Sequence, residues 1–244
     1  MVYFLYMKQL STCKTALIVL SLSLVFSSCT ARIDGSLSAN GSAQLTVNTS
    51  LGAGMTNLIQ RLSAAGGQQG PVLDGPAIAR SLSGAPGITS ASFRNITPSS
   101  ISGQVRISRV NDFLSAAGGR GFIVFEQSAG AGGRCAINID RRNSASILEL
   151  LSPEISDYLN ALMAPIVTGE EMNKQEYIEL VAVFYNRIIS NEIATSRIQV
   201  SVEFPGTVTR ARGGTFTGRR ASFDIPLIDL LVLETPLSYE VAWN

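Results

Sequence analysis

The chain of 244 residues contains no histidine, only three cysteines and a single tryptophan. Without histidine, the Ser-His-Asp and Cys-His arrangements of hydrolases cannot form, and a thiol lacks the partner that usually activates it. Zinc sites draw their ligands mainly from cysteine and histidine, and no stretch of the sequence has the spacing of a calcium-binding loop. We therefore expect no metal, no cofactor and no enzymatic activity.

The sequence also lacks an apolar run long enough to span a membrane. An uncharged, largely apolar stretch from Thr15 to Phe26 follows two lysines and precedes the small pair Ser27-Ser28. A spanning helix needs about 20 apolar residues, whereas this order of positive charge, apolar run and small residues is typical of a secretory signal peptide. We predict that residues 1–28 are such a signal and are removed.

The tetrapeptide FSSC, which ends at Cys29, resembles a lipobox, the site at which bacterial lipoproteins are lipidated and cut. It predicts cleavage between Ser28 and Cys29 and a lipid on Cys29, with palmitate among the acyl chains. The anchor would hold the mature chain on the inner or outer membrane of a cell envelope, on the periplasmic side or at the surface. An ordinary signal peptide with a chance cysteine is the alternative, and the true start could be Met1 or Met7.

Cysteine usage predicts no disulfide, because Cys135 has no intramolecular partner once Cys29 carries lipid. The strand-like segment CAINI around Cys135 favours a small, partly buried side chain. Residues 29–244 are enough for a single α+β lipoprotein domain with a genuine core. A division into subdomains at 30–140 and 141–244 stays open.

The net charge is near zero, yet the charges are unevenly spread. Arginine outnumbers the acidic residues between 30 and 135, and the acidic residues outnumber the basic ones after 135. The basic half lies nearer the expected anchor, and each basic residue held at an anionic membrane surface is worth about 1 kcal/mol. Solvated charges on several faces are the alternative. Nucleic acid is disfavoured as a partner by the exported location and by the acidic second half.

The first half alternates hairpins with short helices. Asn40-Gly41 between two alternating segments is the strongest short-range hairpin signal. The expected strands are Ile33–Ser38, Ala43–Leu51, Ile88–Ile96, Ile101–Val110, Phe122–Gln127 and Arg134–Asp140, and the expected helices are Gly54–Ala64, Pro76–Leu82 and Asp112–Ala117.

The second half is dominated by one long amphipathic helix, expected over 173–195. Asn173 and Glu176 form a capping box at its start, and apolar residues then recur every three or four positions. Such a stripe is more often core than a binding surface, so Phe184 and Ile188 are expected inside. The other elements are helices at Ile147–Leu151 and Glu154–Met163, strands at Arg197–Phe204, Thr215–Asp224 and Leu237–Trp243, and a short apolar segment at Leu227–Leu233. The fold class is α+β, with mostly antiparallel sheets packed on helices.

Two patterns in the sequence are candidates for sites of chemistry. Gly52-Ala53-Gly54 lies between an expected strand and an expected helix, as in dinucleotide-binding folds, but Asn57 stands where a third glycine is required. Pairs of acids could act as general acid and base in a hydrolase, although solvated surface acids are the commoner case. The candidates are Asp224 with Asp229, and Glu149 with Glu154 and Asp157.

The lead from Cys29 into the hairpin ARIDGSLSANGSAQLTV, with the order of elements after it, resembles the LppM-type bacterial lipoproteins over about residues 30–140. The block EYIELVAVFYNRIISNEIATSRIQVSVEFPG is similar to uncharacterised treponemal lipoproteins. The first resemblance implies an envelope domain with an apolar cavity and a role in handling lipid or lipoglycan.

The leading hypothesis is a membrane-anchored, non-enzymatic envelope lipoprotein that binds a lipid or amphiphile near the membrane. The expected cavity lies between the sheet and the helices at 55–64 and 173–195, with an arginine near its mouth. The alternatives are a structural protein that docks on another envelope component, and a hydrolase that uses an acidic pair.

Overall fold

The structure is a computed structural model that describes residues 30–65, 70–116, 121–128, 132–144 and 158–244. Its strands are β1 (Thr30–Leu37), β2 (Ala43–Ser50), β3 (Ile88–Thr97), β4 (Ser100–Ile107), β5 (Ile123–Gln127), β6 (Gly133–Ile139), β7 (Arg197–Glu203), β8 (Val208–Arg212), β9 (Thr215–Thr217), β10 (Arg220–Pro226) and β11 (Leu237–Trp243). Its helices are α2 (Ala53–Ala65), α3 (Gly75–Ser83), α4 (Val110–Ala116), α7 (Pro165–Thr168), α8 (Lys174–Phe184), α9 (Arg187–Thr195) and α10 (Leu227–Val232).

The strands form two sheets. Sheet A has seven strands in the order β3-β4-β2-β1-β7-β10-β9, and sheet B has four in the order β5-β6-β11-β8. The described pairings are antiparallel except for that of β1 with β7, which is parallel. The predicted α+β class with mostly antiparallel sheets is confirmed. Both sheets take strands from both halves of the chain, so a division near residue 140 would separate paired strands in each of them.

Alternation along its strands gives sheet A one apolar and one polar face. In β1, Ile33 lies on one side, and Arg32 and Asp34 lie on the other. The register aligns Ile33 with Val47 of β2 and with Val200 of β7, so apolar residues continue from strand to strand. We call the apolar side the inner face and the polar side the outer face.

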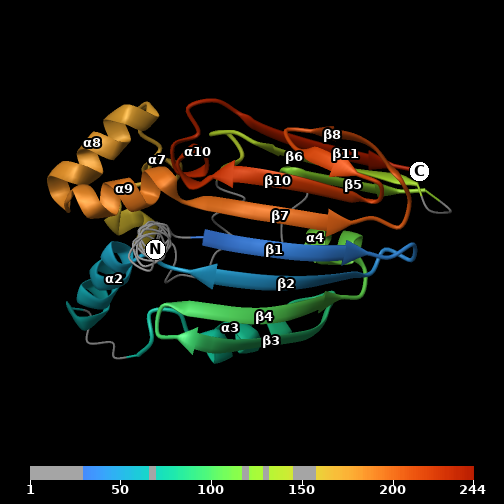
Figure 1. Cartoon of the computed structure of the whole chain (residues 1–244), viewed down its shortest axis with the longest axis horizontal. Helices are drawn as coiled ribbons and strands as arrows, with labels where there is room; N and C mark the ends of the chain where they lie inside the picture. Colours follow the sequence, from blue (N-terminus) through green and yellow to red (C-terminus); the bar gives the residue numbers. More distant parts are fainter. Residues whose placement is uncertain (1–29, 66–69, 117–120, 129–131, 145–157) are drawn as a thin grey trace, which may run out of the picture.

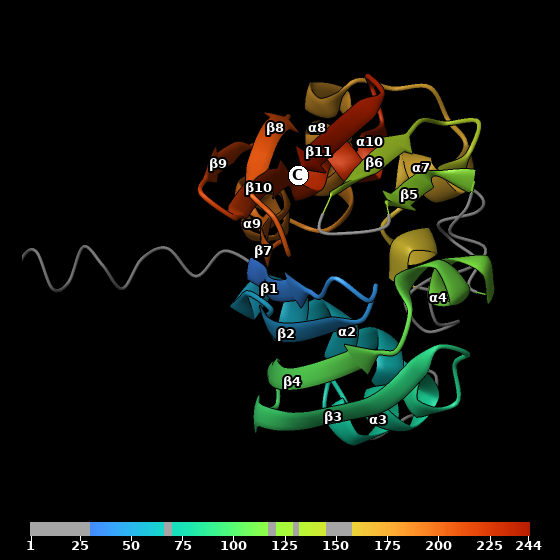
Figure 2. The same cartoon turned by 90° about the vertical axis from the view of Figure 1, so that its right-hand side faces the viewer.

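The other elements cover the inner face and one end of sheet A. Figure 1 looks onto the outer face, with sheet B and α3 behind it. Figure 2, turned by 90°, shows sheet A as one layer, with sheet B, α3 and α4 on its inner side. Helices α2, α8 and α9 gather at the end where β1 begins, which we call the helix end. None of the described helices is both long and apolar enough to cross a membrane.

The larger core cluster fills the space between the helices and sheet B. Tyr177 and Val181 of α8 and Val232 of α10 are 0% exposed, and Ile193 of α9 is 1% exposed. A side chain with no accessible surface has no water-sized space beside it, so this core is packed with protein atoms.

A smaller core cluster joins the two sheets away from the helix end. Its centre is Trp243 of β11, whose ring centroid lies 4.6 Å from that of Phe204 and 6.2 Å from that of Phe125. Leu37 and Ala221 contribute to it from the inner face of sheet A. The sheets are therefore held together at this end by aromatic packing.

The prediction of a single long helix over 173–195 is wrong, because the chain bends between α8 and α9. Tyr185 ends α8, and Asn186 has an extended backbone and caps α9. Its side-chain oxygen accepts hydrogen bonds from the amides of Ile188 (2.9 Å) and Ile189 (3.0 Å). A side chain that satisfies the free amides at a helix start makes a new start favourable there.

The bend divides the apolar stripe into buried and exposed parts. Val181 and Ile189 lie in the core, whereas Phe184 and Ile188 are each 62% exposed, so their expected burial was wrong. The predicted start of the first helix is confirmed, since Asn173 and Glu176 form both hydrogen bonds of the capping box.

Most other predicted elements are confirmed within a few residues, with one clear exception. The expected strand Thr215–Asp224 is a hairpin of β9 and β10 that turns near Gly218, whose φ is +58°. Such a backbone favours glycine. Strand β8 was not predicted, because its sequence VTRAR has only a weak alternation. The helix expected at 147–151, and most of the one expected at 154–163, lie outside the described residues.

Candidate functional site

The middle of the inner face carries aliphatic side chains that belong to neither core cluster. They are Ile33, Leu45, Val47, Ile198, Val200 and Ile225, from β1, β2, β7 and β10, and all of them are half-buried. Ile33 lies between Val47 and Val200 in the register. Ile225 lies opposite Ile198. These residues form a continuous apolar area, which we call the inner patch.

The margins of the inner patch are closed. On β4, the inner-face residues Ile101, Val105 and Ile107 are buried. The ring of Phe93 lies against Gly103, where an added Cβ would come within 2.2 Å of the ring. On the opposite margin, the smaller core cluster joins the sheets. The half-buried aliphatic side chains of the inner face therefore lie between these two margins.

The cavity expected between the sheet and the helices at 55–64 and 173–195 stays a prediction. Tyr177 and Val181, which point inward from α8, are 0% exposed, so protein atoms fill the space beside these two side chains. Partly accessible aliphatic side chains lie instead in the inner patch. The buried side chains of the helices pack on one another and on sheet B. The inner-patch residues at the centre of the inner face are not part of this packing.

The side chains of the inner patch decide what it can do chemically. All of them are hydrocarbons, so they can neither transfer a proton nor coordinate a metal, and they donate no hydrogen bond. They can only exclude water and hold apolar groups by burial. The patch suits an acyl chain or a similar apolar body.

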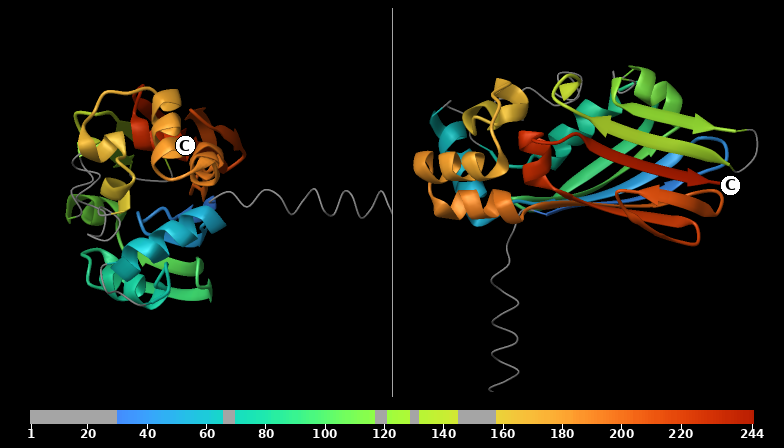
Figure 3. Two further views of the ribbon diagram at one scale, coloured as in Figure 1. Left: turned by 90° about the vertical axis from the view of Figure 1, so that its left-hand side faces the viewer. Right: turned by 90° about the horizontal axis from the view of Figure 1, so that it is seen from above.

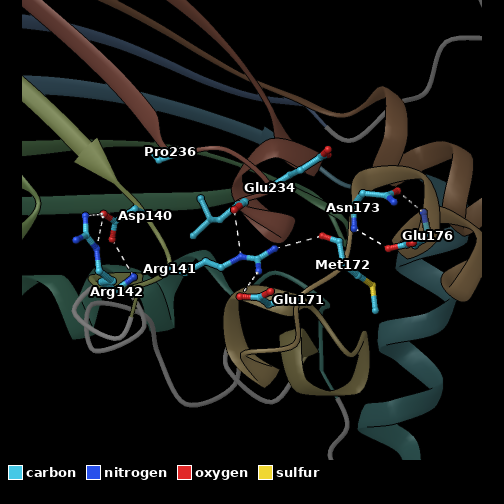
Figure 4. Close-up of a pocket in the computed structure, with 10 residues that line it drawn as sticks. Asp140, Arg141, Arg142, Glu171, Met172, Asn173, Glu176, Glu234 and Pro236 are labelled. Carbon is cyan, nitrogen blue, oxygen red and sulfur yellow. Dashed lines mark hydrogen bonds and ion pairs between the residues drawn. The ribbon is translucent and has the colours of Figure 1, made fainter.

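A charged surface pocket of about 590 Å³ lies elsewhere, between the end of β6 and the start of α8 (Figure 4). Arg141 lies at its centre. The Arg141 guanidinium donates hydrogen bonds to the carbonyl oxygens of Leu233 (3.2 Å) and Met172 (3.3 Å), and it lies 3.6 Å from Glu171. Arg141 thus ties the segment before α8 to the end of α10.

The other charged groups of this pocket also have partners within the protein. Arg142 donates to Asp140 at 2.7 Å, and these hydrogen bonds lower the pKa of the Asp140 carboxyl. Glu176 belongs to the capping box, and Glu234 accepts a hydrogen bond from the amide of Lys174 at 3.2 Å. The charged residues of this pocket therefore have a structural role, because they bond to one another and to the neighbouring segments of the chain.

The glycines before α2 have a structural explanation. Both carboxylate oxygens of Glu192 in α9 accept hydrogen bonds from the first turn of α2, from the amides of Gly54 and Met55, each at 2.8 Å. A Cβ at Gly52 would come within 2.4 Å of this carboxylate, and one at Gly54 within 3.2 Å. The amides that would hold a phosphate in a dinucleotide site are thus already bonded to a carboxylate.

We predict that Glu192→Gln destabilises the fold by about 1–3 kcal/mol, because hydrogen bonds to a buried charged acceptor contribute about that much. Glu192 is 9% exposed, so water cannot easily replace the lost partner. Urea unfolding measures the effect. Glu179→Gln, on the exposed side of α8, is the control and should change little. Equal stability of both variants would contradict the role given to Glu192.

The other acids and the cysteine named from the sequence have different surroundings. Asp224 is exposed on the outer face, whereas Asp229 pairs with Lys174 at 2.9 Å. Cys135 is half-buried in β6, and burial raises the pKa of its thiol to about 11. This thiol stays protonated at neutral pH and is a poor nucleophile. The predicted cleavage and lipidation residues Ser28 and Cys29, and the acids Glu149, Glu154 and Asp157, lie outside the described residues.

The start of β1 fixes where a lipid on Cys29 would be attached. Thr30 is already part of β1, and it pairs with Ser50 of β2 and with Arg197 of β7. Consecutive Cα atoms are about 3.8 Å apart. Thr30, the residue that follows Cys29 in the sequence, therefore lies at the end of a central strand, beside α2 and α9.

Comparison with solved structures finds similarity to the folded domain of the Mycobacterium tuberculosis protein LppM, determined by NMR. The identity is 11% and the TM-score is 0.38, over 91% of this chain and 93% of that chain. No family model matches the sequence, and no curated protein matches it. The resemblance to treponemal lipoproteins stays a prediction.

Proposed function

We propose that the protein is a lipid-anchored, non-catalytic envelope protein that binds an amphiphile, with the apolar part of the ligand held against the inner patch. The observation that carries this proposal is the half-burial of six adjacent aliphatic side chains on the side of sheet A that faces the other layers. In a two-layer fold, the side of a sheet that faces the second layer is normally sealed.

Burial energetics favour an apolar occupant of the inner patch. Full burial of a valine, leucine or isoleucine side chain contributes about 1.5–3 kcal/mol relative to its exposed state. An acyl chain laid along Ile33, Val47 and Val200 would remove the remaining water from several such side chains at once. Ligand sites of this kind are apolar and lie between layers of secondary structure.

The position of the anchor supports an amphiphile rather than another apolar ligand. Because β1 begins directly after Cys29, the domain cannot stand away from the membrane on a tether. A lipid could then pass from the leaflet to the protein over a short path. The first half of the chain, which contains β1 to β4, also carries the excess of arginine.

A matched pair of substitutions on β7 tests the proposal. Val200→Trp fills the inner patch and is expected to weaken binding of a fluorescent fatty acid at least tenfold, about 1.4 kcal/mol. Gln199→Trp places the same side chain on the exposed outer face and should leave the affinity within about twofold. The measurement is fluorescence titration of protein that lacks residues 1–29, with native mass spectrometry to identify the ligand.

Two results would contradict the proposal. One is no binding of fatty acids or envelope lipids by the unsubstituted protein at tens of micromolar. A dissociation constant in that range corresponds to a binding free energy of about 6–7 kcal/mol. The other is equal affinity of the Val200→Trp and Gln199→Trp variants, which would place the ligand away from the inner patch.

A further inference from the structure

Three large apolar side chains are exposed together where the chain bends between α8 and α9. Val183 is 82% exposed, and Phe184 and Ile188 are each 62% exposed. Val183 and Phe184 are the last residues of α8 and Ile188 is the second residue of α9, so the three side chains flank the bend at Asn186. We call Val183, Phe184 and Ile188 the corner patch. Single exposed apolar residues are ordinary, but a group of large ones marks an interaction surface.

The corner patch belongs to the same end of the molecule as the start of β1. The side chain of Ile188 touches the first turn of α2, since a Cβ added at Gly54 would lie 2.9 Å from it. Helix α2 follows β2, whose last residue Ser50 pairs with Thr30. Helix α9 leads into Arg197, which also pairs with Thr30. Figure 3 (left) looks onto this end and shows α8, α9 and α2 around the start of β1.

Charge at this end suits an anionic surface. Arg187 is exposed within the bend, next to the corner patch, and Arg197 is exposed beside Thr30. Of the acids on the same two helices, Glu176 belongs to the capping box and Glu192 is bonded to α2. Glu179 is exposed one turn before Val183 and accepts a hydrogen bond from Gln175, so the two arginines outnumber it. Apolar side chains flanked by arginine are typical of protein segments that lie in the interface of a bilayer.

We propose that the corner patch inserts into the headgroup region of the leaflet that holds the lipid on Cys29, so that the helix end faces the membrane. This inference rests on the proposed lipid anchor. The lipid and the corner patch then make two separate contacts with one membrane, and two contacts fix an orientation that a lipid alone leaves free. Binding at the second contact is strengthened because the anchor raises its effective concentration.

Tryptophan fluorescence in the full mature lipoprotein tests this orientation. The native Trp243 is the single tryptophan and is 3% exposed, so it gives a constant buried signal. Phe184→Trp adds a second one in the corner patch. Phe216→Trp adds one on β9, where the native side chain is 46% exposed towards the other end of sheet A. Each protein is reconstituted in vesicles of phosphatidylcholine and phosphatidylglycerol, with and without bromine on the acyl chains.

Brominated lipid is expected to remove most of the added emission of the Phe184→Trp variant, with a shift to shorter wavelength. The Phe216→Trp variant should lose none. Equal quenching of the two variants, or no quenching of either while the protein stays bound to the vesicles, overturns the orientation and leaves the anchor standing. Protein that remains in solution overturns the anchor and the orientation together. Ligand binding at the inner patch is measured separately, so neither result decides it.

A polar double substitution gives a second readout. Phe184→Gln with Ile188→Gln changes two side chains that are each 62% exposed, so the fold should lose little stability. In the anchored protein, the double variant should tumble more freely, which is seen as lower fluorescence anisotropy of a probe on the domain. If its self-association changes and its vesicle anisotropy does not, the corner patch contacts a second protein copy and the membrane proposal is wrong.

Discussion

Cys29→Ala is expected to move the protein completely from the membrane to the aqueous phase. Each buried methylene of an attached chain contributes about 0.8 kcal/mol, so two or three acyl chains anchor a protein stably, whereas one chain gives only marginal binding. None of the described helices can replace that anchor by crossing the membrane. The contacts proposed for the corner patch are too few to hold the protein without lipid.

Detergent phase partition and intact mass measure this effect. Cys135→Ala is the matched control, because Cys135 is a half-buried thiol within β6 and should not carry lipid. The control should remain in the detergent phase with an unchanged lipid mass. If the Cys29→Ala variant still enters the detergent phase and is still cut after Ser28, the lipoprotein interpretation fails.

Val181→Asp is expected to abolish folding. Val181 is 0% exposed in the larger core cluster, and an unpaired carboxylate there would be cut off from water. Burial of an unpaired charge belongs to the most destabilising class of substitution, at about 4 kcal/mol or more. The expected result is insoluble protein, or soluble protein without a cooperative thermal transition.

Phe184→Asp, three residues later on the same helix, provides the contrast. Phe184 is 62% exposed, so the same aspartate stays in water there and should cost no more than about 1 kcal/mol, including its unfavourable place near a helix C-terminus. Circular dichroism during thermal unfolding compares the two variants. Similar losses in both would mean that α8 presents a different side to the core.

Local signals predicted much of the fold because they act between neighbouring residues. Asn173 and Glu176 are three positions apart and satisfy the free amides of one helix turn, so their pattern is readable without the rest of the chain. Strand β11 was predicted with its observed bounds, Leu237–Trp243, from alternation alone. These features depend on backbone hydrogen bonding over a few residues.

The bend at Asn186 shows where such reasoning stops. Asparagine is an ordinary residue on the exposed side of a helix, and it is also a strong N-cap, so the sequence around it permits either outcome. The chain bends if the burial of Ile189 and Ile193 in the core lowers the free energy more than an uninterrupted helix would. That balance involves α2, α10 and sheet B, which lie far away in the sequence.

The inner patch could not be predicted from the sequence, for a related reason. Alternation predicts which side of β1 or β7 is apolar, but it cannot show how completely another layer covers that side. Coverage depends on how far sheet B and the helices extend across sheet A, which is set by long-range packing. The role of Glu192 at Gly52 and Gly54 was missed in the same way, because the residues that bond lie far apart in the chain.

The parallel pairing of β1 with β7 has a consequence for the order of assembly. During synthesis, β1 and β2 are complete long before β7 exists, so one edge of β1 keeps unpaired amides and carbonyls while most of the chain is made. Such an edge is a template for wrong pairing with another chain. Closing a loop as long as the one from Thr30 to Arg197 is also slow, because a large loss of chain entropy precedes the first contact. Until β7 pairs with β1, this edge stays open to wrong pairing, and the folding rate depends on when the second half of the chain reaches the first strand.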